Sequence, residues 1–284
     1  MPLVSSVLDR YHPTVDEFLS HVEELRERSG WDESVRAARV ERIRAVDGGF
    51  ELDGRGAFRH VLVAPGYPGL NVPEELRRDA RVVHAYEPHA YAPSVTVVGA
   101  GLAAATEWLN ALDAGSEVVS VRRREPLRRP LNVPREYFSQ RGLAPFHRLG
   151  PEERQARLRR LLAPSYPPGR RFDEQLARAR GEGRFRVETS VNGSEQVICA
   201  TGFVHGYQGD ALLARLVSEH DLATAGDWIV LDADASVPSL TDSTRTLALA
   251  GARAQWAYPA ADTLAGARYV AHGFLRRIKA CRTR

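Results

Sequence analysis

The sequence is poor in the residues that mark several kinds of protein. It holds two cysteines, Cys199 and Cys281, and among its 39 lysine and arginine residues a single lysine, Lys279. The cysteines lie far apart and form no Cys-x-x-Cys pair, which excludes a dithiol reductase with a close redox pair and gives no zinc-site spacing. Cys199 lies in an apolar run and is expected to be a core residue. This use of cysteine fits a reducing cytoplasm.

Long apolar runs and a strong net charge are also absent. No apolar segment approaches the roughly 20 residues that span a bilayer. The first ten residues lack a basic segment followed by an apolar core, so no signal peptide is predicted. The net charge is only +3, and no stripe of basic and aromatic residues appears, which argues against a nucleic-acid partner. The preference for arginine over lysine is more typical of a GC-rich genome than of selection at each site.

What is present is an ordinary globular composition and one informative motif. With 284 residues, 43% of them hydrophobic, the chain can bury a large core and could form two modest domains. An apolar run, Val95 to Val98, is followed at once by Gly-x-Gly-x-x-Ala and then by apolar residues at helical spacing. This strand–turn–helix context is the one that a dinucleotide fingerprint requires.

Each position of that turn has a physical role. Gly99 permits the tight turn, Gly101 lets the backbone approach a pyrophosphate, and Ala104 lets the helix pack close to the strand. The helix N-terminus, with its free N–H groups and positive dipole end, then meets the phosphates. The other interpretation is a glycine-rich turn without a ligand. The predicted cofactor contacts of this turn are Gly99, Ala100, Gly101, Leu102 and Ala104.

Three arginines refine the prediction of the cofactor. Residues 115–121 predict the next strand, and Arg122, Arg123 and Arg124 stand at its end, where NAD enzymes place an acidic residue on the ribose hydroxyls. Arginine suits a 2′-phosphate instead, through its charge and its forked hydrogen bonds. We therefore predict NADP(H) rather than NAD(H). Because arginine is abundant throughout this chain, a solvated arginine-rich loop is the alternative.

The apolar spacing predicts further elements around this unit. Residues 14–28 have helical spacing, with Thr14 as N-cap and Glu17 completing a capping box. Residues 35–46 alternate, which predicts a strand. Further strands are predicted over 60–64, 185–187, 196–200, 228–231 and 247–250, and further helices over 151–162, 172–179, 212–217 and 261–278.

Two apolar strands end in glycine after a small residue, and the fingerprint unit lies between them. These ends are Ala64-Pro65-Gly66 and Ala200-Thr201-Gly202, and a terminal apolar strand ends at Gly251. In this order the segments resemble the two-dinucleotide-domain flavoproteins, and within them the flavin-containing monooxygenase-like group. The resemblance covers nearly the whole chain. The cofactor contacts that it implies beyond the fingerprint are Ala64, Gly66, Ala200, Thr201, Gly202 and Gly251.

The resemblance implies an α/β fold of two Rossmann-like lobes, with an NADP-binding lobe inserted into an FAD-binding lobe. Residues 1–92 and 205–284 would form the FAD-type domain, and residues 93–204 the NADP(H)-binding domain. The implied function is that of an FAD-dependent NAD(P)H oxidoreductase, monooxygenase-like, with NADPH as electron donor and a small-molecule substrate or electron acceptor. The flavin carries such chemistry, so no catalytic side chain is assigned.

The sequence departs from this family on the FAD side. Residues 1–60 contain no Gly-x-Gly-x-x-Gly unit, Gly251 is followed by Ala252 rather than aspartate, and Pro65 removes a backbone donor. Without its first strand the FAD-type sheet is expected to have a gap at its centre. Three explanations stay open: a longer gene product, a second chain or homo-oligomer that completes the sheet, or closure without FAD. The alternative function is a non-catalytic NADP(H)-binding module or a remnant that no longer binds FAD.

Other polar and aromatic residues are weaker candidates. His84, Glu87 and His89 cluster in a loop, but they make a thin case for a metal, and a polar linker is the preferred interpretation, so no metal site is predicted. His205 lies at the domain junction, near the nicotinamide or as a solvated hinge residue. For Trp256 and Tyr258, lining a flavin-side pocket and core packing are equal alternatives.

Overall fold

The computed structural model describes residues 14–130, 133–191 and 193–282. The first ten residues, on which the prediction about a signal peptide rests, lie outside the described residues. The chain divides into two compact units, one that ends at Val40 and one that begins at Glu41. No helix among the described residues is long and apolar enough to cross a membrane.

The first unit contains α2 (Val15–Arg28) and the single-turn α3 (Trp31–Ser34). The predicted capping box is confirmed at the start of α2. The Thr14 hydroxyl accepts from the N–H of Glu17 at 3.2 Å, and the Glu17 carboxylate accepts from the N–H of Thr14 at 2.7 Å. Each side chain accepts a hydrogen bond from the backbone N–H of the other residue, and this reciprocal pair fixes the residue at which α2 begins.

The strand predicted over residues 35–46 is much shorter in the structure. Only β1 (Ile43–Val46) forms, and residues 35–42 are not in a strand. The Asp53 carboxylate accepts from the N–H groups of Glu41 and Arg42, in the latter case at 3.0 Å. These donors therefore bond to a side chain rather than to a neighbouring strand.

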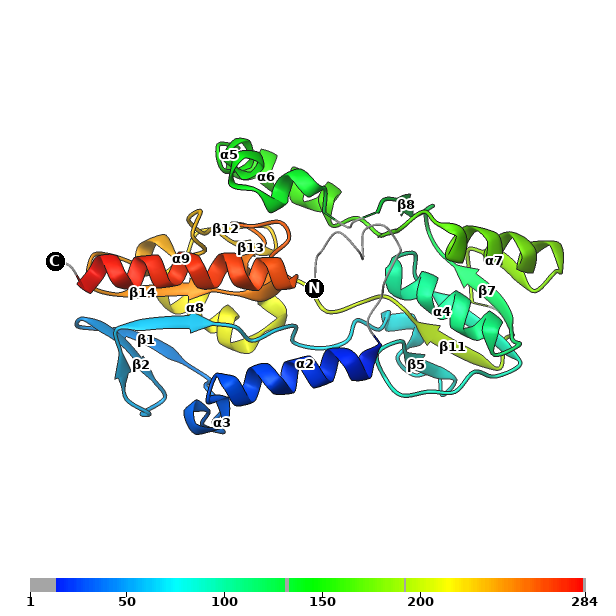
Figure 1. The fold of residues 1–284 in the computed structure, drawn as a ribbon, viewed down its shortest axis with the longest axis horizontal. Helices are drawn as coiled ribbons and strands as arrows, with labels where there is room; N and C mark the ends of the chain where they lie inside the picture. Colours follow the sequence, from blue (N-terminus) through cyan, green and yellow to red (C-terminus); the bar gives the residue numbers. More distant parts are fainter. Residues whose placement is uncertain (1–13, 131–132, 192, 283–284) are drawn as a thin grey trace. The chain divides into compact units, whose positions relative to one another are not determined.

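The second unit contains a parallel sheet of five strands in the order β10-β7-β6-β11-β5 (Figure 1). The strands are β5 (Val82–His84), β6 (Ser94–Val98), β7 (Glu117–Val121), β10 (Phe185–Glu188) and β11 (Gln196–Cys199). The helices α4 (Leu102–Asp113) and α7 (Arg170–Gly181) pack on each other and on one face of this sheet. Strands joined by helical crossovers make the α/β class that the sequence predicts.

The core of this lobe follows from the apolar strands and from α4. Val95 and Val97 of β6, together with Ala104, Trp108 and Leu109 of α4, are at most 1% exposed and belong to one cluster. On the other sheet face a smaller cluster forms under the 3-10 helix η1 (Glu74–Leu76). Because both faces are covered, the inner strands β6, β7 and β11 are buried at consecutive residues rather than at alternate ones.

A second lobe is built on a parallel pair of strands. β4 (His60–Val63) and β14 (Thr246–Leu249) pair directly, with Thr246 opposite His60 and Leu249 opposite Val63. The predicted gap therefore does not separate these two strands. Among the described residues β14 is the only strand that pairs with β4, so the far edge of β4 is where this small sheet ends. The far edge of β14 is closed by residues 235–237, since the N–H of Val237 donates to Leu247 at 2.8 Å.

Further elements surround this pair. The antiparallel strands β1, β2 (Gly49–Leu52) and β3 (Ala57–Phe58) form one small sheet, and β12 (Thr224–Ala225) pairs with β13 (Trp228–Ile229). The strand predicted over residues 228–231 is thus a two-residue hairpin arm outside the parallel sheets. The remaining elements are β8 (Leu127–Arg128), β9 (Ser165–Tyr166), α5 (Gln140–His147), α6 (Pro151–Leu161), α8 (Ala211–His220), α9 (Leu264–Arg282), η2 (Arg135–Phe138), η3 (Tyr207–Gly209), η4 (Pro238–Leu240) and η5 (Gly251–Ala254).

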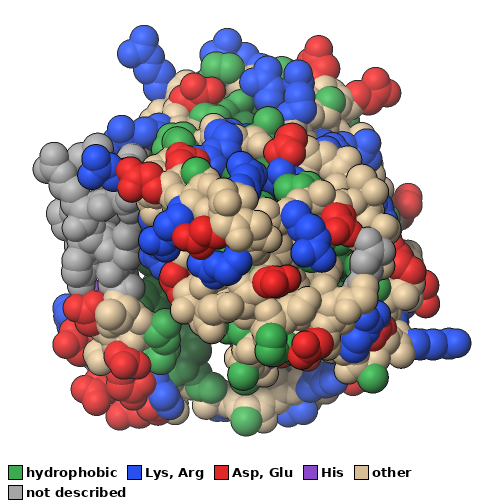
Figure 2. Space-filling view, turned by 90° about the vertical axis from the view of Figure 1, so that its right-hand side faces the viewer, with side chains coloured by type: hydrophobic (Ala, Val, Ile, Leu, Met, Phe, Trp, Pro, Cys, Tyr) green, Lys and Arg blue, Asp and Glu red, His purple; other side chains and the backbone are tan. Residues whose placement is uncertain are grey.

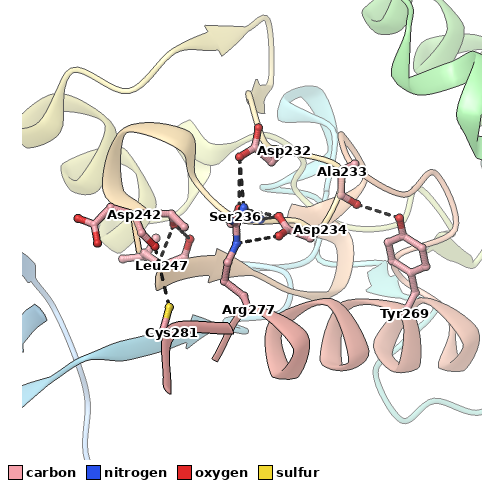
Figure 3. Close-up of polar contacts among 10 residues, drawn as sticks. Asp232, Ala233, Asp234, Ser236, Asp242, Leu247, Tyr269, Arg277 and Cys281 are labelled. Carbon is pink, nitrogen blue, oxygen red and sulfur yellow. Dashed lines mark hydrogen bonds and ion pairs between the residues drawn. The ribbon is translucent and has the colours of Figure 1, made fainter. Parts of the chain in front are cut away.

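The helix α9 is held against the loop that precedes β14 (Figure 3). Arg277 donates from Nε to the Asp234 carboxylate at 3.0 Å, and the Tyr269 hydroxyl donates to the carbonyl of Ala233 at 2.8 Å. Asp234 also accepts from the N–H of Ser236 at 3.1 Å. These contacts hold residues 232–236 beside the outer edge of β14, and so they fix the loop that closes this sheet.

Two contacts link segments that lie on different sides of the expected domain boundaries. β5 lies within residues 1–92, yet it pairs with β11, so the five-stranded sheet takes one strand from the first expected segment. The helices α5 and α6 lie within residues 93–204, but His147 bonds through Nε2 to the carbonyl of Ala257 at 2.7 Å. Contacts thus link segments on both sides of residues 92 and 204, and the division of the chain at these residues stays a prediction.

Candidate functional site

The turn between β6 and α4 has the geometry that the fingerprint predicts. Gly99 has φ +143°, and a Cβ there would lie 2.4 Å from the carbonyl oxygen of Ala200 and 3.4 Å from the Cβ of Ala104. Only glycine fits this position without a shift of the backbone. Gly101 differs, because its φ is −91° and a Cβ there would meet nothing within 4 Å. The space in front of Gly101 is therefore open to a ligand.

The N-terminus of α4 is well placed to bind an anion. Gly101 is the N-cap and offers no side chain to the first N–H groups, and the first turn contains no acidic residue. The first helical hydrogen bond is donated by the backbone N–H of Ala105 to the carbonyl of Gly101 at 3.0 Å. The N–H groups of Leu102 and of the next two residues thus point out of a 12-residue helix along its dipole. This arrangement suits a pyrophosphate.

The three arginines after β7 lie in different surroundings. The Arg122 side chain is only 6% exposed, lies 5.7 Å from the ring centre of Trp108, and bonds to Glu125 at 2.7 Å. The Arg123 side chain is 90% exposed, with a distant partner in Glu75 at 3.6 Å, and Arg124 is exposed as well. The structure thus leaves Arg123 and Arg124 available to a phosphate, while Arg122 packs on the helix that carries the fingerprint.

The end of β11 forms a crossover between the two lobes. Ala200 donates to the carbonyl of Val98 at 2.9 Å, and Gly202 has φ +74°. Thr201 donates from its hydroxyl to the carbonyl of Asn71, whose side chain donates back to the carbonyl of Thr201 at 3.3 Å. The segments at residues 69–71 and 201–204 therefore run side by side and position residues 200–202 beside the fingerprint turn.

Aromatic rings reinforce this crossover. Tyr67 stacks on Phe203 with ring centres 4.4 Å apart, and Tyr86 stacks on Phe203 at 4.7 Å. His205 meets the edge of Tyr67 at 5.6 Å. His205 is exposed at the surface, but the surrounding protein removes part of the water around its ring. This desolvation lowers the pKa of His205, and the charge of Arg253 lowers it further, so both favour the neutral ring.

The second lobe fits a flavin dinucleotide only in part. Gly66 after β4 has φ +73° and Gly251 after β14 has φ +62°, so both strand ends turn as the resemblance implies, and Ala64 is exposed beside the first. Yet the next element after β4 is the three-residue η1, and β14 is followed by the four-residue η5 before the longer α9 begins at Leu264. Neither η1 nor η5 is a helix with an appreciable dipole. The turns directly after β4 and β14 therefore lack a helix N-terminus like the one that follows Gly101.

The polar cluster near His84 has a structural role. His89 contacts the Glu107 carboxylate at 3.1 Å, and the Tyr91 hydroxyl donates to the same carboxylate at 2.9 Å. Glu87 accepts from the backbone N–H of His84 at 2.7 Å. No group of three or more His, Cys, Asp or Glu side chains that could hold a metal occurs in the described ranges. These residues tie the loop after β5 to α4.

Other candidates prove to be core residues. Trp256 and Tyr258 are 1% and 2% exposed, and Arg154 lies 5.1 Å from the ring centre of Trp256. Core packing is thus the outcome for both aromatic residues. Cys199 is fully buried, and this burial raises the pKa of its thiol to about 11, so it stays protonated.

Sequence reasoning missed Arg253, which follows Gly251 in η5. It is 8% exposed and lines a cavity of about 250 Å³ beside β14. An arginine two residues after the glycine that ends a parallel strand is a signal that could have indicated it, because ligands gather at the carboxyl ends of such strands. On the outer surface of the five-stranded lobe, charges of both signs are mixed: Figure 2 shows basic and acidic side chains interspersed over that surface.

These features define a two-lobed α/β dinucleotide fold, and comparison with solved structures identifies its relatives in fold. The ornithine hydroxylase of Pseudomonas aeruginosa superposes with a TM-score of 0.65 at 19% identity, over 97% of this chain and 77% of that one. An ornithine N-hydroxylase of Kutzneria sp. 744, solved with reduced FAD, NADP+ and L-ornithine, has a TM-score of 0.63 at 17% identity, over 94% and 78% of the two chains. The L-lysine 6-monooxygenase of Pseudomonas syringae has a TM-score of 0.58 at 15% identity, over 84% and 71%.

The resemblance that the sequence motifs suggested is confirmed at the level of the fold, which this chain shares with the two hydroxylases and the monooxygenase named above. By sequence alone, no protein-family model and no curated protein matches this chain.

Proposed function

We propose that this chain is an NADPH-dependent oxidoreductase of the flavoprotein kind, acting on a small-molecule substrate or electron acceptor. The observation that carries the proposal is the uncapped N-terminus of α4 behind Gly101, with Arg123 and Arg124 exposed at the end of the neighbouring β7. The helix would hold the pyrophosphate and the two arginines the 2′-phosphate. Thr201 and Gly202 would lie along the nicotinamide half.

Within this kind of enzyme we favour a monooxygenase, because the proteins of the same fold compared above are named as hydroxylases and a monooxygenase. A bound flavin would take a hydride from NADPH and pass the electrons to dioxygen or to another acceptor. FAD would need donors beyond those that β4 and β14 provide here. We propose that a further segment or chain supplies them beside the edge of β4 that faces away from β14, as in a homo-oligomer. The two free cysteines suit a cytoplasmic location.

The alternative function is a module that binds NADP(H) without flavin chemistry. Such a module would need no second pyrophosphate site. The two proposals differ in a simple measurement: the visible absorbance of the purified protein, before and after incubation with FAD, followed by NADPH oxidation. Bound flavin with NADPH oxidation supports the enzyme. A colourless protein that binds NADPH supports the module, and a protein that binds no NADPH refutes both.

A further inference from the structure

Arg253 is a buried cation with few partners. The positive φ of Gly251 turns the chain at the end of β14, and η5 then carries Arg253 inward, where only 8% of it is exposed. Nη1 donates to the carbonyl of Gly206 at 2.8 Å, while Nε and Nη2 have no hydrogen-bond partner among the described residues. Arginine is seldom buried to this extent unless it is paired, because desolvation of the charge is costly.

Arg253 forms no ion pair with a carboxylate of the described residues. Asp210 is the acidic residue whose charge acts most on Arg253, but its carboxylate is already engaged as the N-cap of α8, accepting from the N–H of Leu213 at 3.1 Å. Burial lowers the pKa of Arg253. Even a lowered arginine pKa leaves the group charged at neutral pH. The protein therefore maintains a buried positive charge that Asp210 offsets only through space, without an ion pair among the described residues.

The space beside this charge is large enough for a small ligand. The cavity of about 250 Å³ is lined by Arg253 and Gln255, by the aromatic side chains of Tyr67, Tyr207 and Trp228, and by the end of β14 at Leu249. Arg159 and Asp227 also line it and add one charge of each sign, so the net charge contributed by Arg253 stays positive. Burial, and then the charge of the neighbouring Asp262, raise the pKa of Tyr67 to about 12, so its hydroxyl stays protonated and has Asp262 as a partner.

We propose that this cavity binds a carboxylate or phosphate group of a small ligand, with Arg253 as the anchor. The proposal rests on the proposed function, since it names the chemistry of the ligand that this lobe takes. A guanidinium matches the planar fork of a carboxylate and two oxygens of a phosphate. The aromatic walls suit a planar or apolar body attached to that group. Tyr67 both lines the cavity and stacks on Phe203, so the bound ligand adjoins the crossover at Gly202.

Calorimetric titration with two matched pairs of probes tests this proposal. FMN and riboflavin differ by a phosphate, and benzoate and benzamide differ by the charge of a carboxylate. We expect the anionic member of at least one pair to bind about 10- to 100-fold more tightly, the range that a charge-assisted hydrogen bond supplies. A preference within the first pair identifies a phosphate ligand, and one within the second identifies a carboxylate ligand.

Variants show whether Arg253 carries the preference. Arg253→Met should abolish it, whereas Arg170→Met, a change at a side chain that is 91% exposed on α7, should leave it intact. Replacing an unpaired buried charge with an apolar side chain of similar length is tolerated in folded proteins. Should Arg253→Met nevertheless fail to fold, Arg253→Lys tests the same point, because it keeps the charge, loses the fork and should weaken the preference.

Equal affinity for both members of both pairs, or a preference that survives Arg253→Met, overturns the proposal. NADPH binding is measured on the same samples, so that failure of the proposed function is recognised separately. Loss of NADPH binding in the unmodified protein refutes the dinucleotide site, whereas loss of the anion preference alone refutes the role of Arg253.

Discussion

The substitution Gly101→Ala separates ligand binding from stability at the fingerprint turn. Gly101 has φ −91°, which alanine adopts without strain, and a Cβ there would meet nothing within 4 Å. Alanine is a poorer N-cap than glycine by about 0.5–1 kcal/mol. It also lowers the entropy of the unfolded chain, which stabilises the fold by about 0.4–1 kcal/mol. We therefore expect the free energy of unfolding to change by less than about 0.5 kcal/mol.

The effect on NADPH should be much larger. The added methyl group would lie in the open space in front of α4, where the pyrophosphate is proposed to sit. Forcing one extra carbon into a close-packed contact costs about 1–3 kcal/mol, which corresponds to a roughly 5- to 150-fold rise in Kd. Fluorescence titration with NADPH measures the Kd, and urea unfolding measures the stability of the same sample.

Gly150→Ala is the matched control. Gly150 is also an N-cap without a side-chain bond, with φ −62° and open space at its Cβ, but it begins α6 rather than α4. This variant should have the same small effect on stability and none on NADPH. If Gly101→Ala binds NADPH as tightly as the Gly150→Ala control, the pyrophosphate does not approach the N-terminus of α4 and the reasoning is refuted.

Three further predictions concern Gly99, the two exposed arginines after β7, and Asp242. Gly99→Ala should lower the free energy of unfolding by about 2–6 kcal/mol, from strain at φ +143° and overlap with a carbonyl oxygen; a urea midpoint equal to that of Gly101→Ala would contradict this. Arg123→Gln with Arg124→Gln should weaken NADPH binding about tenfold and leave NADH binding unchanged, as measured by parallel titrations. Hydrogen bonds from Thr244 lower the pKa of Asp242 from 3.8 to about 2, so its contribution to stability is present above the unfolded value and is lost as pH falls through the folded one. The difference in urea midpoint between the unmodified protein and Asp242→Asn should accordingly shrink between about pH 4 and pH 2.

Local signals predicted the elements that depend on local chemistry. The helix after Thr14 begins where the capping box places it, because that bonding pattern involves residues only three apart. The fingerprint turn is likewise local, since the backbone angle at Gly99 and the close packing of Ala104 are set within one turn of helix. The prediction of a strand over residues 35–42 was wrong, because an alternating apolar pattern does not by itself provide a neighbouring strand to pair with. The Asp53 carboxylate accepts from the N–H groups of Glu41 and Arg42 instead.

The sites that involve several segments were less predictable. The prediction of a central gap in the second lobe did not anticipate the direct pairing of β4 with β14, which depends on residues far apart in the chain. Sequence placed Arg122 and Arg123 in equivalent positions, but in the structure Arg122 packs on Trp108 and Arg123 is exposed. Nothing in the spacing of Trp256 distinguishes a pocket wall from core packing, and burial under Arg154 decided it.

The sequence by itself determined the α/β class and the dinucleotide turn, because both follow from hydrophobic period and from glycines whose backbone angles or open surroundings are local properties. Only the tertiary structure decided which strands pair, which arginines are exposed toward a phosphate, and that Arg253 is buried beside a cavity without an ion pair among the described residues. The reason is that burial and electrostatic pairing depend on what the rest of the chain brings near a side chain. For Arg253 those neighbours are Gly206, Asp210 and Tyr67, residues that the sequence order places far from it.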